Sequence, residues 1–168
     1  SIKMELGYTG DAINSINEIQ TFNAEDLSLL TKASFELLKS GDFANAKELI
    51  EKSDELHSDS AIDITRLGIL KLSISDVEGI ANLEEAVDIS PELPLARMAL
   101  ASAYLYNKDY EKAHDLANKW KLESDNSIDG YRLAARTFLL QNKIDKAEIE
   151  FHKILEFAPE SAYALMYF

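Results

Sequence analysis

The segment Gly41-Asp42-Phe43-Ala44-Asn45-Ala46 joins two stretches of helical character. The segments Lys108-Asp109-Tyr110-Glu111-Lys112-Ala113 and Lys143-Ile144-Asp145-Lys146-Ala147 follow the same order: a polar turn, a bulky apolar residue, and Ala three residues further on. The small residues at the matching places are spaced by 33, 34 and 34 residues: Ala46, Gly79, Ala113 and Ala147. Self-similarity at such a period indicates a chain built from repeated supersecondary units.

The stretches on either side of these turns have helical periodicity. Leu30, Ala33, Ser34 and Leu37 have the i, i+3, i+4, i+7 spacing of one apolar stripe on a helix. Only three prolines and six glycines interrupt 168 residues, and 46% of the residues are hydrophobic. Pro91 and Pro159 fall just past predicted second helices, where proline ends one helix and opens the next. The sequence therefore predicts an all-α chain of helix pairs.

This pattern resembles the tetratricopeptide repeat (TPR), whose unit has a Gly-Asp-Tyr-like turn between two helices and a small residue early in the second. Full repeats map to 27–60, 61–93, 94–127 and 128–161. A partial repeat at 1–26 has its second helix near 11–20, and 162–168 begins the next first helix. The resemblance implies a single solenoid fragment over 1–168, a right-handed superhelix of about ten helices with first helices on the concave side.

The sequence departs from the family's pattern in two places that have structural consequences. The repeat at 61–93 is one residue short near Ser73–Ser75 and lacks the Gly-Asp turn. Trp120 stands where the family usually has a small residue, so we expect it to splay its helix pair or to reach outward. Among the aromatic residues, Tyr106 and Trp120 are the two that we predict to be exposed contacts in addition to the groove residue Phe35. Most of the remaining ones have core phase: Tyr8, Phe22, Tyr104, Tyr110, Tyr131, Phe138, Phe151 and Phe157.

Composition limits what the protein does. The formal net charge is −13, which disfavours binding to nucleic acid and to anionic membrane surfaces. No stretch has the length and apolarity of a membrane-spanning helix, so no direct membrane insertion is expected. No Cys is present, and His57, His114 and His152 have no partner at ligand spacing. No nucleotide-binding loop or nucleophile motif occurs either. We therefore predict no enzyme activity, no catalytic residue, no metal and no cofactor.

The predicted first helices carry seven basic residues against three acids, although the whole chain is strongly acidic. Their stripes, which the resemblance places on the concave groove, define the candidate partner-binding site: Lys32, Phe35, Arg66, Ile69, Met98, Ser102, Arg132 and Arg136. One interpretation is a groove for a protein or peptide segment, including acidic segments, held by Arg and Lys with apolar contacts between them. The other is that these cations pair with acids of neighbouring helices. Both stay open at this point.

The sequences of Pro94–Leu105 and Glu78–Ala86 are similar to those of TPR lipoproteins that accompany exosortase and PEP-CTERM systems in Gram-negative exopolysaccharide export. That likeness favours the periplasm or cell envelope over the cytoplasm, although the sequence itself specifies no compartment. The leading hypothesis is a non-catalytic protein–protein interaction scaffold. The alternatives are an assembly component of a bacterial envelope export system and a regulatory TPR segment of a larger protein. Both chain ends resemble cut repeats, which would leave apolar faces uncapped near Ile13 and Ile16 and near Leu165, Met166 and Phe168. This predicts self-association through the ends.

Overall fold

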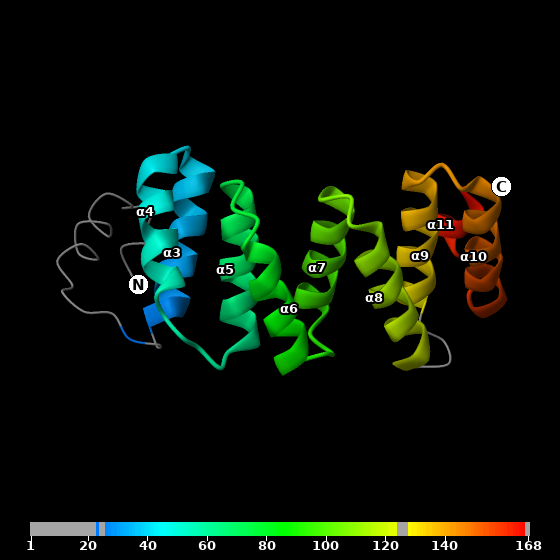
Figure 1. Cartoon of the computed structure of the whole chain (residues 1–168), viewed down its shortest axis with the longest axis horizontal. Helices are drawn as coiled ribbons and strands as arrows, with labels where there is room; N and C mark the ends of the chain where they lie inside the picture. The colour runs from blue at the N-terminus through cyan, green and yellow to red at the C-terminus, as the bar shows by residue number, and fades with distance from the viewer. Residues whose placement is uncertain (1–22, 24–25, 124–127, 167–168) are drawn as a thin grey trace. The chain divides into compact units, whose positions relative to one another are not determined.

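The computed structural model describes residue 23, residues 26–123 and residues 128–166, and this part contains nine helices and no strand (Figure 1). The helices are α3 (Leu27–Ser40), α4 (Phe43–Asp54), α5 (Ala61–Ser73), α6 (Gly79–Ile89), α7 (Pro94–Tyr106), α8 (Tyr110–Glu123), α9 (Ile128–Leu140), α10 (Ile144–Phe157) and α11 (Ala162–Leu165). The predicted all-α fold is confirmed. The helix expected near 11–20 lies outside the described residues.

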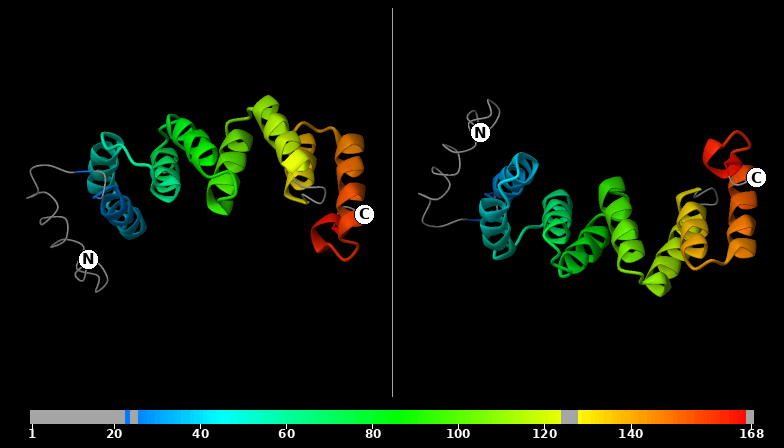
Figure 2. Two further views of the ribbon diagram at one scale, coloured as in Figure 1. Left: turned by 90° about the horizontal axis from the view of Figure 1, so that it is seen from below. Right: turned by 90° about the horizontal axis from the view of Figure 1, so that it is seen from above.

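The chain divides into two compact units within α7. Unit 1 runs to Leu100 and unit 2 begins at Ala101. In unit 1, α3 packs against α4, α5 packs against α6, and α5 also contacts both α3 and α4. Figure 2 shows α3 and α4 side by side next to α5. In unit 2, α9 packs against both α8 and α10, and α11 packs against α10.

The same turn joins the two helices of each pair. One residue adopts the left-handed conformation, and the next backbone N–H donates to a carbonyl in the last turn of the preceding helix. The left-handed residues are Gly41, Ser75, Lys108 and Asn142, with φ of 83°, 66°, 59° and 58°. After Ser75, the Asp76 N–H donates to the Lys71 carbonyl at 2.9 Å. The repeat at 61–93 therefore keeps the turn geometry although it lacks the Gly-Asp residues.

Small residues set the distance between packed helices. A Cβ on Gly68 of α5 would lie 2.8 Å from the carbonyl oxygen of Gly79 on α6, so the two backbones touch. In unit 2, a Cβ on Gly130 of α9 would lie 2.8 Å from the Ala117 carbonyl oxygen on α8. The contact of α5 with α6 lies within a helix pair and that of α8 with α9 between consecutive pairs, and in both no side chain fits between the backbones.

Apolar residues from successive helices fill the core of each unit. Leu27, Ile50, Leu67 and Leu70 form one cluster that joins α3, α4 and α5. In unit 2 the cluster is Ala135, Ala147, Phe151, Ile154 and Ala164. Buried hydroxyl groups are satisfied within their own helices; Thr31, for example, donates to the Leu27 carbonyl at 2.9 Å.

One aromatic expectation is confirmed and one is wrong. Tyr106 is 91% exposed, as predicted, whereas Trp120 is only 4% exposed. The close crossing of α8 and α9 brings Gly130 close to both the Ala117 carbonyl oxygen and the Lys121 nitrogen, and Trp120 is buried although it lies beside the crossing. A large apolar ring buried there gains free energy by leaving water.

The end of the described chain exposes apolar side chains. Leu165 is half exposed and Met166 is more exposed still. The other residues in the predicted end-to-end contact, Ile13, Ile16 and Phe168, lie outside the described residues. Self-association through the ends therefore stays a prediction.

The substitution Gly68→Ala tests the close crossing of α5 and α6, because the sign of the change in unfolding free energy distinguishes a close crossing from an open one. In an open helix, Gly68→Ala would stabilise by about 1 kcal/mol through helix propensity. We expect a loss of about 1–3 kcal/mol instead, because the new Cβ would also lie 2.9 Å from Leu83 Cγ and would force α5 and α6 apart. Urea unfolding followed by circular dichroism measures the change. The exposed α6 substitution Glu85→Ala is the control, and a stabilised Gly68→Ala variant would contradict the packing.

Candidate functional site

The exposed stripes of α3, α5 and the part of α7 in unit 1 define a surface that we call the first-helix face. Lys32 and Phe35 are exposed on α3, and Arg66 and Ile69 are partly exposed on α5. Because α3 and α5 pack against each other, these four candidate residues lie on neighbouring helices. Met98 of α7 belongs to the same compact unit and is 69% exposed.

Two apolar residues on this face were not among the predicted site residues. Ile62 and Leu95 are each 46% exposed. Ile62 shares a stripe with Arg66 and Ile69 at i, i+4 and i+7, and Leu95 lies three residues before Met98. Both are the second residue of their predicted repeats, so an alignment of the repeats could have identified them from the sequence. Apolar residues at equivalent exposed positions indicate a contact surface more than a core.

Charges on the first-helix face are only partly neutralised. Arg66 Nη1 lies 2.8 Å from Asp63 Oδ1 on the same helix. Lys32 forms no ion pair with any residue that the structure describes. An ion pair between partly exposed groups contributes little free energy, so Arg66 can exchange Asp63 for an incoming carboxylate at small cost.

The remaining candidate residues, Ser102, Arg132 and Arg136, are exposed in unit 2. Arg132 Nη1 lies 3.6 Å from Asp129 Oδ1, and its guanidinium carbon is 5.3 Å from the centre of the Tyr163 ring. Within the described part of the chain, Arg136 has no ion-pair partner. A continuous row from Lys32 to Arg136 would cross both units and stays a prediction.

Lys71 is a first-helix cation that does not join the face. It is 3% exposed, and its Nζ lies 2.8 Å from Asp54 Oδ1, 3.5 Å from Glu78 Oε2 and 3.6 Å from Asp76 Oδ2. Burial alone would lower the pKa of Lys71, but the hydrogen bond to Asp54 and the surrounding negative charges outweigh it and raise the pKa. The Asp54 partner is 17 residues earlier in the chain, so no local pattern predicts this cluster.

The histidines do not assemble into a reactive group. His57 and His152 are exposed, and the His114 ring packs on Phe138 with 4.3 Å between ring centres. Among the described residues, no three side chains of His, Asp or Glu are placed to hold a metal ion. No helix in the described ranges has both the length and the apolarity to span a membrane.

Comparison with solved structures identifies proteins that have a similar fold. No protein-family model matches the chain. Crystal structures of MamA and of YrrB, described as a TPR protein with an unusual peptide-binding site, match it with TM-scores of 0.69 and 0.68. The MamA match has 21% identity over 96% of this chain and 88% of that one, and the YrrB match has 14% identity over 98% and 86%.

A tetratricopeptide repeat protein from Parabacteroides merdae matches with a TM-score of 0.63 and 19% identity, over 85% of this chain and 57% of that one. The structural neighbours are TPR proteins, so the fold is that of a TPR helical-repeat solenoid, as the sequence predicts. The likeness to the exosortase-associated lipoproteins remains an expectation from sequence.

His114 gives a pH dependence with a defined sign. Burial, together with the charges of Lys143 and Lys121, holds the pKa of His114 below its usual value of about 6.5. The unfolded chain therefore binds more protons than the folded chain as the pH falls below about 6.5, and folding loses free energy in that range. We expect the unfolding free energy of the wild type to fall more steeply from about pH 7 to pH 5 than that of His114→Gln.

Denaturant unfolding at each pH measures these slopes. Equal slopes for the wild type and His114→Gln would show that His114 titrates as a solvated histidine.

Proposed function

We propose that this protein is a non-catalytic scaffold that binds a segment of a partner protein along its first-helix faces. The observation that supports the proposal is that unit 1 exposes the apolar residues Ile62, Leu95 and Met98 on the first helices that carry the cations Lys32 and Arg66, or on the next first helix in sequence order. Apolar side chains that remain exposed contribute little to the free energy of folding. They supply contact area to a partner when water is excluded between them.

The chemistry of the face fits an extended or helical segment that combines apolar and acidic residues. Apolar side chains of the partner would lie on Ile62, Leu95 and Met98, and its carboxylates would pair with Lys32 and Arg66. Arginine binds carboxylates with two parallel hydrogen bonds, which adds specificity to the contact. In unit 2, Arg132 and Arg136 offer the same chemistry.

Local ion pairs reduce what the cations contribute. Because Arg66 and Arg132 already pair with Asp63 and Asp129, a partner carboxylate must replace an existing contact. The apolar residues should therefore supply most of the affinity, and the cations should select acidic segments and confer salt dependence. The peptide-binding site described for YrrB is consistent with this use of the fold.

Peptides selected from a random linear library on the wild-type protein test the proposal. The face variant Ile62→Ser/Met98→Ser removes two exposed apolar contacts without opening the core. We expect it to weaken most selected peptides by about tenfold or more. Fluorescence anisotropy gives the affinities, and circular dichroism confirms that the variants are folded.

The matched control is Phe43→Ser/Ile149→Ser, which removes two apolar residues, 66% and 61% exposed, from second helices. Its affinities should stay within about twofold of the wild type. For peptides that contain Asp or Glu, Arg66→Glu should weaken binding and Lys153→Glu should not. If the face variant and its control behave alike, the first-helix face is not the binding surface.

A further inference from the structure

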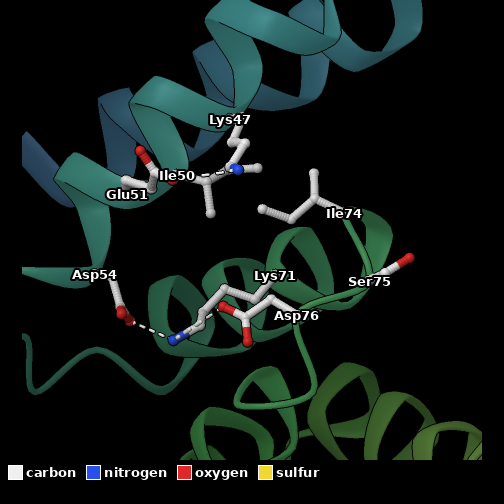
Figure 3. Close-up of a pocket in the computed structure, with 8 residues that line it drawn as sticks. All are labelled: Lys47, Ile50, Glu51, Asp54, Lys71, Ile74, Ser75 and Asp76. Carbon is white, nitrogen blue, oxygen red and sulfur yellow. Dashed lines mark hydrogen bonds and ion pairs between the residues drawn. The ribbon is translucent and has the colours of Figure 1, made fainter.

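The cations on the first helices of unit 1 differ in how far neighbouring carboxylates already occupy them. Lys71 of α5 is buried, and Figure 3 shows its side chain beside Asp54 and Asp76, whose oxygens lie 2.8 Å and 3.6 Å from Nζ. Lys32 of α3 is exposed and forms no ion pair with any residue that the structure describes. Arg66 is intermediate, because it is partly exposed and pairs with a carboxylate of its own helix.

The contact between Arg66 and Asp63 is short and partly shielded from water. Arg66 Nη1 donates to Asp63 Oδ1 at 2.8 Å, and the two side chains are 30% and 16% exposed. In unit 2, the pair of Arg132 and Asp129 has the same sequence spacing, but its atoms are 3.6 Å apart and its side chains are 47% and 71% exposed. Partly buried charges are screened less by salt than exposed ones, so Asp63 holds Arg66 more firmly than Asp129 holds Arg132.

The start of α5 fixes the position of Asp63 independently of Arg66. Asp63 lies in the first turn of α5, and its backbone N–H donates to the Ser60 hydroxyl at 3.3 Å and to the Ser60 carbonyl at 3.0 Å. A carboxylate in the first turn of a helix is also stabilised by the partial positive charge of the free backbone N–H groups there. Asp63 therefore remains beside Arg66 when a partner approaches.

We propose that Asp63 is a specificity-determining residue of the first-helix face, because it acts as an internal ligand of Arg66. The inference rests on the proposed function and adds to it where an acidic residue of the partner contributes to affinity. A partner carboxylate at Arg66 replaces one carboxylate contact by another and approaches the charge of Asp63, so it gains little. A partner carboxylate at Lys32 forms a contact without displacing one.

The face of unit 1 thus has one open cation on α3 and one masked cation on α5. It should select a mainly apolar segment whose acidic residue lies against Lys32, and it should give little preference to a segment whose acidic residue lies against Arg66.

Chemical modification of the full chain tests the masking of Arg66 without any partner. Phenylglyoxal modifies guanidinium groups, and mass spectrometry of the digested protein gives a rate for each arginine. Asp63→Asn should speed the modification of Arg66 by about threefold or more, because the charge that holds the guanidinium is lost. The control Asp59→Asn removes the same charge from an exposed residue shortly before α5 and should change that rate by less than about 1.5-fold.

A glutamate scan tests the specificity. The probes are analogues of one library-selected apolar peptide, which the face variant Ile62→Ser/Met98→Ser weakens, with a single Glu moved through successive positions. On the wild type, the positions where Glu improves the Kd by about threefold or more should lose that gain in Lys32→Gln. On Asp63→Asn, at least one further position should gain about threefold and lose the gain when Arg66→Gln is added. Fluorescence anisotropy gives the Kd values, and circular dichroism confirms that each variant is folded.

Two results would overturn the inference alone: an unchanged modification rate of Arg66 in Asp63→Asn, or a glutamate scan that gives the same positions for the wild type and for Asp63→Asn. Failure of the proposed function has a different signature. If no selected peptide is weakened by the face variant, peptides do not bind to the first-helix face, and both proposals are contradicted together.

Discussion

The contact between the backbones of α5 and α6 at Gly68 and Gly79 is the constraint on which unit 1 depends. Helices that touch at a point without side chains have a fixed separation, and that separation sets how every other side chain of the pair is placed. Arg66 lies two residues from Gly68, on nearly the opposite side of α5. The crossing therefore turns the stripe with Ile62 and Ile69 outward. Unit 2 uses the same device where Gly130 meets the Ala117 carbonyl oxygen.

Two surfaces of unlike chemistry follow from this arrangement in unit 1. On one side of α5, exposed apolar residues and cations form the first-helix face. On another, Lys71 is buried against α4 and collects Asp54, Asp76 and Glu78 around its ammonium. A buried cation that lost these partners would be costly, so the cluster ties the α5–α6 turn to α4.

The repeat period made the helices predictable, because small residues such as Ala46 and Gly79 mark where paired helices must approach. Local patterns also placed Lys32 and Met98 on exposed stripes. The features that sequence reasoning missed depend on tertiary neighbours. The turn at Ser75 keeps its geometry without glycine, since its hydrogen bond to the Lys71 carbonyl holds it. Trp120 is buried although the contact with Gly130 reaches Lys121 beside it, and Lys71 is buried against Asp54, which comes from a distant part of the sequence.

The most direct test of this account is the distance between the α-protons of Gly68 and Gly79 in solution, measured as nuclear Overhauser effects in a protein whose only protonated residues are glycines. The account predicts a strong cross-peak between the two glycines, because their backbones touch in the crossing of α5 and α6. Absence of that cross-peak, with the intraresidue glycine signals present, would contradict it, since a wider crossing would no longer fix the outward stripe of α5.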